Sequence, residues 1–196
     1  MPCAFRLSVI VGPHLPNFGR EGYAPTDLDW IHKDIDRDAD VYLRVFRATE
    51  GGPSGNHWSA DWRVGAMADG PMLAGLSAIR KLEVQQDPGH THLTNWGPRT
   101  GMVDMMTAAA QDAFFLGRLS LPQRKHLERI AAWEPVRVPD GIWNCQHWLK
   151  SVLKKAVEAG LLEAETVARA VTAAAMVPNR KVTQAERDLG KNRYIL

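Results

Sequence analysis

The chain has 196 residues, of which 45% are hydrophobic and 23% are charged, so it can bury a sizeable core and is not generally disordered. A formal charge of +2 gives no reason to expect nucleic acid or an anionic membrane as a partner. Two cysteines are too few for a disulfide framework, and no apolar run has the length of a signal-peptide core or a membrane span. We therefore expect a cytoplasmic protein with reduced thiols.

The N-terminal half has the residue pattern of an antiparallel sheet. Apolar and β-branched residues predict strands at 4–11, 41–47, 57–64 and 114–119. The Gly- and Pro-containing turn at 49–55, which joins the second and third of these strands, favours an antiparallel meander. The remaining stretches are a long loop at 13–40 with a short turn of helix around 30–36, a segment at 72–84 that fits either strand or helix, and a second loop at 85–101.

The C-terminal half has the periodicity of helices. Ser120 is a suitable N-cap for a first helix, and Asn144 for a second, which Gly160 ends. A third helix is predicted from about 163 to 176, and Pro178 closes it. The second helix carries apolar residues at i, i+3, i+4, i+7, i+8 and i+11: Cys145, Trp148, Leu149, Val152, Leu153 and Ala156. These patterns predict one α+β domain over 1–178, with an antiparallel sheet packed against helices, and a polar, basic tail over 179–196.

Cys145 is the residue best placed for chemistry, because it falls in the first turn of the second helix. The free N–H groups and the positive end of the helix dipole stabilise a thiolate, which makes the sulfur nucleophilic. The same N–H groups can bind an oxyanion in acyl transfer. A nucleophilic thiol also needs a base, normally a histidine from another element. The alternative is that Cys145 is a small buried residue at the start of the apolar stripe.

The segment around Cys145 resembles a known family. Residues 144–149, Asn-Cys-Gln-His-Trp-Leu, are similar to the Asn-Cys-Glu-His-Phe-Val motif of the lecithin:retinol acyltransferase group, a circularly permuted branch of the papain-like, NlpC-type fold. The wider context is closer to a group of small fungal proteins. Four features of these proteins have counterparts here: the first strand at 7–13, a strand–helix pair at 115–133, a Pro-Val pair at 135–136 and a Trp-Asn-Cys-x-x-Trp helix at 143–149.

This resemblance spans residues 5–160 and implies a permuted papain-like arrangement, with a histidine early on a strand and the cysteine late on a helix. The expected histidine positions hold Arg6 and Leu43 instead. We therefore take His57 as the candidate base. The alternatives are that His90 or His92, from the loop at 85–101, supplies the imidazole, or that the protein has lost thiol chemistry. Arg6 cannot act as a base, because its pKa is too high, but it can pair with an anionic substrate.

The remaining histidines could bind a metal, and the tryptophans could line a substrate pocket. His90 and His92 would need a third ligand such as Asp87 or His57, and because their segment is loop-like we predict no metal and no cofactor. His147 lies about 200° around the helix from Cys145 and is read as a packing residue. The expected substrate contacts, which assume that the tryptophans are not simply core residues, are Arg6, Trp58, Trp62, Trp143, Asn144 and Trp148.

The sequence thus favours a thiol-dependent hydrolase or acyltransferase that acts on an amide or ester of a small molecule or peptide. Cys145 is the predicted nucleophile and His57 the predicted base. One alternative is a non-thiol protein on the same scaffold that binds a small molecule or guides a cyclisation or isomerisation, with Arg6, His57 or Asp61 as polar anchors. The other is a catalytically inactive interaction module.

Overall fold

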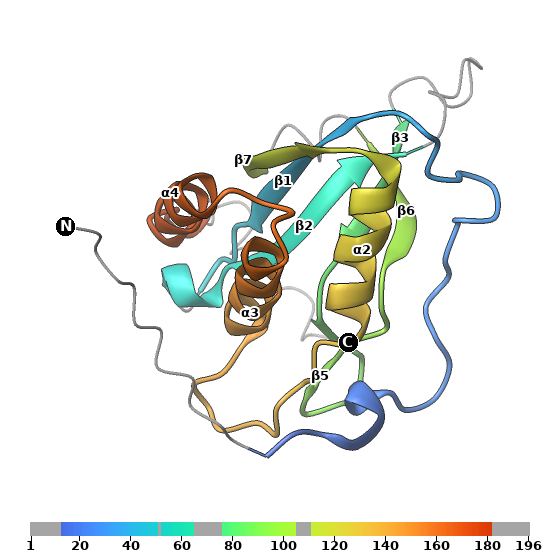
Figure 1. The fold of residues 1–196 in the computed structure, drawn as a ribbon. Helices are drawn as coiled ribbons and strands as arrows, with labels where there is room; N and C mark the ends of the chain where they lie inside the picture. The colour runs from blue at the N-terminus through green and yellow to red at the C-terminus, as the bar shows by residue number, and fades with distance from the viewer. Residues whose placement is uncertain (1–12, 51, 65–75, 105–110, 182–196) are drawn as a thin grey trace.

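The protein is an α+β domain in which a five-stranded antiparallel sheet packs against three helices (Figure 1). This arrangement comes from a computed structural model that describes residues 13–50, 52–64, 76–104 and 111–181. The predicted fold class, antiparallel sheet against helices, is confirmed. The predicted strand at 4–11, with Arg6, and most of the predicted tail lie outside the described residues.

The five strands of the sheet lie in the order β6-β3-β2-β1-β7, and each neighbouring pair is antiparallel. Their bounds are β1 Ala39–Phe46, β2 His57–Arg63, β3 Leu76–Leu82, β6 Arg99–Asp104 and β7 Asp112–Leu119. A separate two-stranded hairpin is formed by β4 (Gln85–Gln86) and β5 (Leu93–Thr94). Two short 3-10 turns, η1 (Pro16–Gly19) and η2 (Pro53–Gly55), precede β1 and β2 respectively.

The structure confirms the predicted strands that match β1, β2 and β7, and it resolves the ambiguous segment 72–84 as β3 within its described part. The prediction of a loop at 85–101 is wrong in part, because this stretch holds the hairpin and the start of β6. Strands of two residues are too short to show alternation, so the pattern could not reveal them. At 30–36 there is no helix but one turn, in which the N–H groups of Ile31 and His32 donate to the Leu28 carbonyl.

Two of the three helices begin at the polar caps predicted from the sequence, Ser120 and Asn144. The three helices are α2 Leu121–Ala132, α3 Cys145–Glu158 and α4 Ala164–Ala175. Ser120 starts α2 with a capping box, in which its N–H donates to the Gln123 side chain at 2.9 Å. Gly160, with φ of 69°, follows the end of α3, a conformation that glycine adopts without strain. Within the described segments, no helix is long and apolar enough to cross a membrane.

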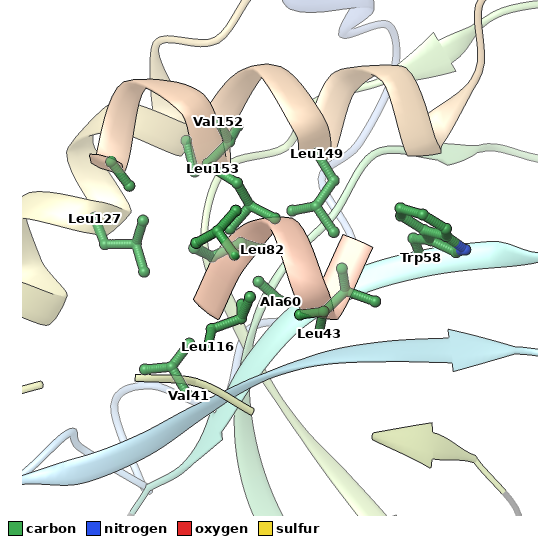
Figure 2. Close-up of a cluster of buried hydrophobic side chains, with 14 of the residues drawn as sticks. Val41, Leu43, Trp58, Ala60, Leu82, Leu116, Leu127, Leu149, Val152 and Leu153 are labelled. Atoms are coloured by element: carbon green, nitrogen blue, oxygen red, sulfur yellow. The ribbon is translucent and has the colours of Figure 1, made fainter. Parts of the chain in front are cut away.

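The core lies between the sheet and the helices. Alternate residues of β1 are fully buried, and β2 is buried on both faces from Trp58 to Trp62. The helix α3 lies against β2, and α4 lies against β7 and β1. Leu149, Val152 and Leu153 of α3 pack among the buried strand residues (Figure 2). Three of the tryptophans, Trp58, Trp62 and Trp148, are buried in this core. Their burial supports the packing interpretation rather than the pocket wall predicted from the sequence.

The long loop before β1 is tied to α2 by a buried ion pair. Arg124 donates to both carboxylate oxygens of Asp34 at 2.9 and 2.8 Å, and the indole N–H of Trp62 donates to the same carboxylate at 3.0 Å. Arg124 also donates to the carbonyls of Ile35 and Arg37. These bonds compensate the burial of the guanidinium and fix the end of the loop against the helical layer.

We expect Leu149→Ala to lower the free energy of unfolding by about 2–5 kcal/mol, because it removes a fully buried side chain and leaves a cavity against β2. Chemical denaturation measures the change. Met176→Ala is the control, since Met176 is exposed and its truncation should change stability by less than about 0.5 kcal/mol. Equal effects of the two substitutions would contradict this assignment of the core.

Candidate active site

Cys145 is the first residue of α3, and Asn144 caps the helix. The Asn144 side-chain oxygen accepts from the N–H groups of Gln146 at 3.0 Å and His147 at 3.4 Å. The ring of His147 in turn lies 3.0 Å from that oxygen, so it helps to hold the cap. The predicted position of the thiol at a capped helix start is therefore confirmed, and His147 is a capping residue that does not face the partner of Cys145.

Gln146 joins the start of α3 to the turn that precedes β2. Its buried amide nitrogen donates to the carbonyls of Pro53 at 2.8 Å and Asn56 at 2.9 Å, and lies 3.3 Å from that of Ser54. Asn56 is itself fully buried and donates to the Val177 carbonyl at 2.8 Å. These bonds position the first residue of β2, which is His57, beside Cys145.

His57 lies between a thiol and a carboxylate. Its Nε2 lies 3.0 Å from Oε2 of Glu83, and its ring is close enough to Cys145 for the two groups to shift each other's pKa, while the thiol itself donates to the Asn56 carbonyl at 3.9 Å. Because Nε2 is engaged by Glu83, Nδ1 is the ring nitrogen left for the thiol. Glu83 follows β3 directly and also lies 3.5 Å from Arg99. A thiol, an imidazole and a carboxylate are thus brought together, an arrangement in which a cysteine can be activated.

The charges of these groups support one another against burial. Burial alone would lower the pKa of His57, but the hydrogen bonds and charges of Cys145 and Glu83 raise that pKa to about 9. Burial likewise opposes the Cys145 thiolate, yet His57 and the backbone N–H groups of Trp58 and Gln146 bring the thiol pKa below its ordinary value. His57, Lys81 and Arg99 lower the pKa of Glu83 in the same way. Both shifts act in favour of the charged forms, a thiolate on Cys145 and an imidazolium on His57.

The start of α3 also offers a donor for an oxyanion. Asn144 uses the N–H groups of Gln146 and His147, whereas the N–H of Cys145 lies at the first helical position, where no acceptor within the helix exists. A backbone N–H group at this position can donate to a carbonyl oxygen that gains charge. The sequence expectation of an oxyanion site near Cys145 is therefore narrowed to this one group.

An open pocket of about 780 Å³ lies beside the thiol. Its lining includes the residues on both sides of Cys145, namely Asn144 and Gln146, and the side chains of Trp143 and Ile142. Cys145 and His57 are not themselves lining residues; Cys145 is 9% exposed and the His57 side chain 33% exposed. The pocket thus reaches both sequence neighbours of Cys145 but not Cys145 or His57 themselves.

The predicted substrate contacts are only partly brought together. Asn144 and Trp143 line the pocket, as predicted. The fully buried tryptophans do not, because their rings fill the core; these are Trp58, Trp62 and Trp148. Asp61, considered as a polar anchor, is buried and pairs with Arg44 at 2.8 Å. Leu43, where the resemblance implies a histidine, is a fully buried core residue.

Glu83 is the functional candidate that the sequence analysis missed. The segment 72–84 was ambiguous, so no neighbour could be assigned to its charged end. β2 and β3 are paired with Ala60 opposite Leu82, which places the residue after Leu82 near the start of β2. A carboxylate at the end of the strand that follows a histidine-bearing strand is the signal that would have identified it.

Comparisons of the chain with models of known protein families, with curated proteins and with solved structures found no match. The interpretation of the site therefore depends on its own geometry.

We expect Gln146→Met, which keeps the side-chain volume but removes the donors, to lower the free energy of unfolding by about 1–3 kcal/mol. The reason is that the buried Asn56 carbonyl and the part-buried Pro53 carbonyl lose their partner. Denaturation monitored by tryptophan fluorescence measures the loss. An unchanged unfolding free energy would contradict the role of Gln146 in joining α3 to β2.

We also expect the pH dependence of Cys145 alkylation by iodoacetamide to report the His57 contact. The reaction requires the thiolate, so its rate rises through the thiol pKa, which in the wild type lies below the value of about 8.5 of a free cysteine. In His57→Asn the midpoint should move upward, because burial is then no longer compensated. Glu83→Gln should move it in the same direction by less.

The exposed His14 provides the matched control, since His14→Asn should leave the profile unchanged. Identical profiles for wild type and His57→Asn would show that the imidazole does not act on the thiol.

Proposed function

We propose that the protein is a cysteine-dependent hydrolase or acyltransferase that acts on an amide or ester. Cys145 is the nucleophile, His57 is the base and acid, and Glu83 orients His57. The observation that carries this proposal is the position of the His57 ring between the Cys145 thiol and the Glu83 carboxylate. A buried cysteine that served only for packing would not need an imidazole and a carboxylate aligned behind it.

The chemistry proceeds in two steps. The Cys145 thiolate attacks the substrate carbonyl carbon, and the N–H of Cys145 donates to the oxyanion of the tetrahedral intermediate. The His57 imidazolium gives its proton to the leaving amine or alcohol, and an acyl thioester remains on Cys145. His57, now neutral, takes a proton from water or an acceptor alcohol or amine, whose attack releases the acyl group and restores the thiolate.

The order of the three groups along the chain supports a permuted papain-like arrangement as part of the proposal. His57 begins β2, Glu83 follows β3, and Cys145 begins α3. The resemblance of residues 144–149 implies this order, with the histidine early on a strand and the cysteine late on a helix. The resemblance implies histidines at the positions of Arg6 and Leu43. In this proposal His57, at the start of the strand after the one that carries Leu43, takes that role instead.

The lining of the pocket favours a substrate that carries negative charge near the scissile bond. Arg137 and Lys150 line it together with the imidazoles of His92 and His147, and none of its lining residues is acidic. Trp143 and Ile142 add apolar surface. A carboxylate next to an amide or ester would pair with the cations while the apolar part contacts Trp143.

We expect a single acyl group to accumulate on Cys145 when the full chain is mixed with a p-nitrophenyl ester, followed by slower turnover. Cys145→Ala should abolish both, and His57→Asn should lower the rate by about 10²–10⁴-fold. Mass spectrometry of the intact chain detects the thioester, and p-nitrophenolate absorbance gives the rate. His14→Asn should retain the wild-type rate.

The rate should also fall at high pH with an apparent pKa near that of His57, about 9, because the proton that His57 gives to the leaving group is then lost. Turnover by Cys145→Ala at the wild-type rate would reject the thiol mechanism and favour a non-thiol role for the pocket.

A further inference from the structure

We propose that Glu21, His90 and His92 form a binding site for Zn²⁺. This site uses none of the three residues proposed for catalysis and does not depend on the proposed function, although His92 also lines the pocket. His90 and His92 lie in the loop of the β4–β5 hairpin, and Glu21 lies in the segment that follows η1. Among the described residues, these three form the group of three or more His, Cys, Asp or Glu side chains whose ligand atoms all lie within 4.8 Å of one another.

The geometry of the three side chains suits a single ion. One ligand atom from each residue lies within 4.8 Å of the others, and the two imidazole rings are stacked with centroids 5.1 Å apart. Zinc at about 2.0–2.2 Å from its nitrogen and oxygen ligands brings those ligands to within roughly 3.3 Å of one another. Glu21 is exposed, so its carboxylate can close this gap without moving the backbone.

His92 is already oriented in the way that a zinc ligand is. Its Nε2 lies 2.9 Å from the Gly19 carbonyl oxygen, and because a carbonyl can only accept, Nε2 carries the proton. This fixes the tautomer and leaves the lone pair on Nδ1. A ring N–H that donates to a backbone carbonyl is the usual support for a metal-bound histidine.

Gly19 makes that approach possible. Its φ is 75°, and a Cβ added there would lie 2.6 Å from the Leu93 carbonyl oxygen and 3.1 Å from the His92 ring. The same Gly19 carbonyl also accepts from the Thr94 hydroxyl at 3.1 Å. The η1 segment, which leads to Glu21, is thereby held against the hairpin that carries His92.

His90 is held through its backbone, which leaves its ring available. Its N–H donates to the Asp87 carbonyl at 3.0 Å, and its carbonyl accepts from the Gln86 side chain at 2.6 Å. The ring nitrogen Nδ1 is buried and has no hydrogen-bond partner among the described residues. A buried imidazole nitrogen without a partner is costly, and a metal-bound neighbour or a coordinated ion would account for it.

The two third ligands considered from the sequence are engaged elsewhere. Asp87 accepts from Gln85 at 2.7 Å and from the indole N–H of Trp96 at 2.8 Å, and His57 is bonded to Glu83. Glu21 supplies the carboxylate instead, although it lies 69 residues before His90 in the chain. Because Glu21 is so far from His90 and His92 in the sequence, no short motif contains all three ligands.

The donor set suits a transition-metal ion such as Zn²⁺. Two imidazoles and one carboxylate suit Zn²⁺, whereas Ca²⁺ and Mg²⁺ prefer oxygen ligands alone. Three protein ligands leave a coordination position for water or for a ligand. Because His92 also lines the pocket beside Cys145, that position would lie at the wall of the pocket formed by the hairpin.

The test is calorimetric titration of the full chain with Zn²⁺, and separately with Mg²⁺. We expect one Zn²⁺ per chain and no Mg²⁺ binding. His90→Ala and Glu21→Gln should each weaken Zn²⁺ binding by at least about 10- to 100-fold. Neither substitution removes a side-chain hydrogen bond that holds the described structure, so both variants should fold, as circular dichroism will show.

Two control variants locate the ion. His14→Ala removes an exposed histidine and should leave Zn²⁺ binding unchanged. Cys145→Ala should also bind one Zn²⁺ with wild-type affinity, although it lacks the nucleophile. If Cys145→Ala loses the ion, or if His90→Ala keeps it, zinc binds elsewhere and the proposal is wrong; an absence of saturable binding to the wild type would overturn it as well.

Discussion

The hydrogen bonds of the buried Gln146 amide hold the candidate site together. They join the first turn of α3 to the 53–56 segment, and this segment leads directly into β2. Cys145 belongs to the helix and His57 to the strand, so neither element alone creates a reactive thiol. The cap from Asn144 fixes where the helix begins, and Gln146 fixes where that beginning lies relative to the sheet. The proposed chemistry thus depends on a polar side chain that acts through its hydrogen bonds to backbone carbonyls.

Burial and charge act against each other at Cys145, and the balance decides whether the thiol is reactive. An isolated buried thiol would hold its proton, and an isolated buried imidazole would lose one. Placed together they stabilise the opposite states, with Glu83 supplying the negative charge behind His57. Removing either end of this chain of contacts leaves a buried group that reverts to its neutral form, which is why the proposed mechanism needs all three residues.

Much of the fold could be predicted from the sequence, because β1, β2, α2 and α3 have clear periodicity and caps at Ser120 and Asn144. Cys145 was found for the same reason, since a capped helix start is a local pattern. Glu83 and Glu21 could not be found, because each meets its partner only through strand pairing or a loop contact far away in the chain. Trp58, Trp62 and Trp148 were misplaced in the predicted pocket because sequence alone does not distinguish an aromatic ring in a core from one that lines a cavity.

The most direct test of the account is to titrate the ultraviolet absorbance of the Cys145 thiolate against pH, as the difference between the wild type and Cys145→Ala. A thiolate stabilised by His57 predicts a midpoint well below the value of about 8.5 for a free cysteine. The same titration in His57→Asn should return the midpoint to that value or above it. A wild-type midpoint at or above about 8.5 would contradict the thiolate–imidazolium pair, and with it the proposed nucleophile.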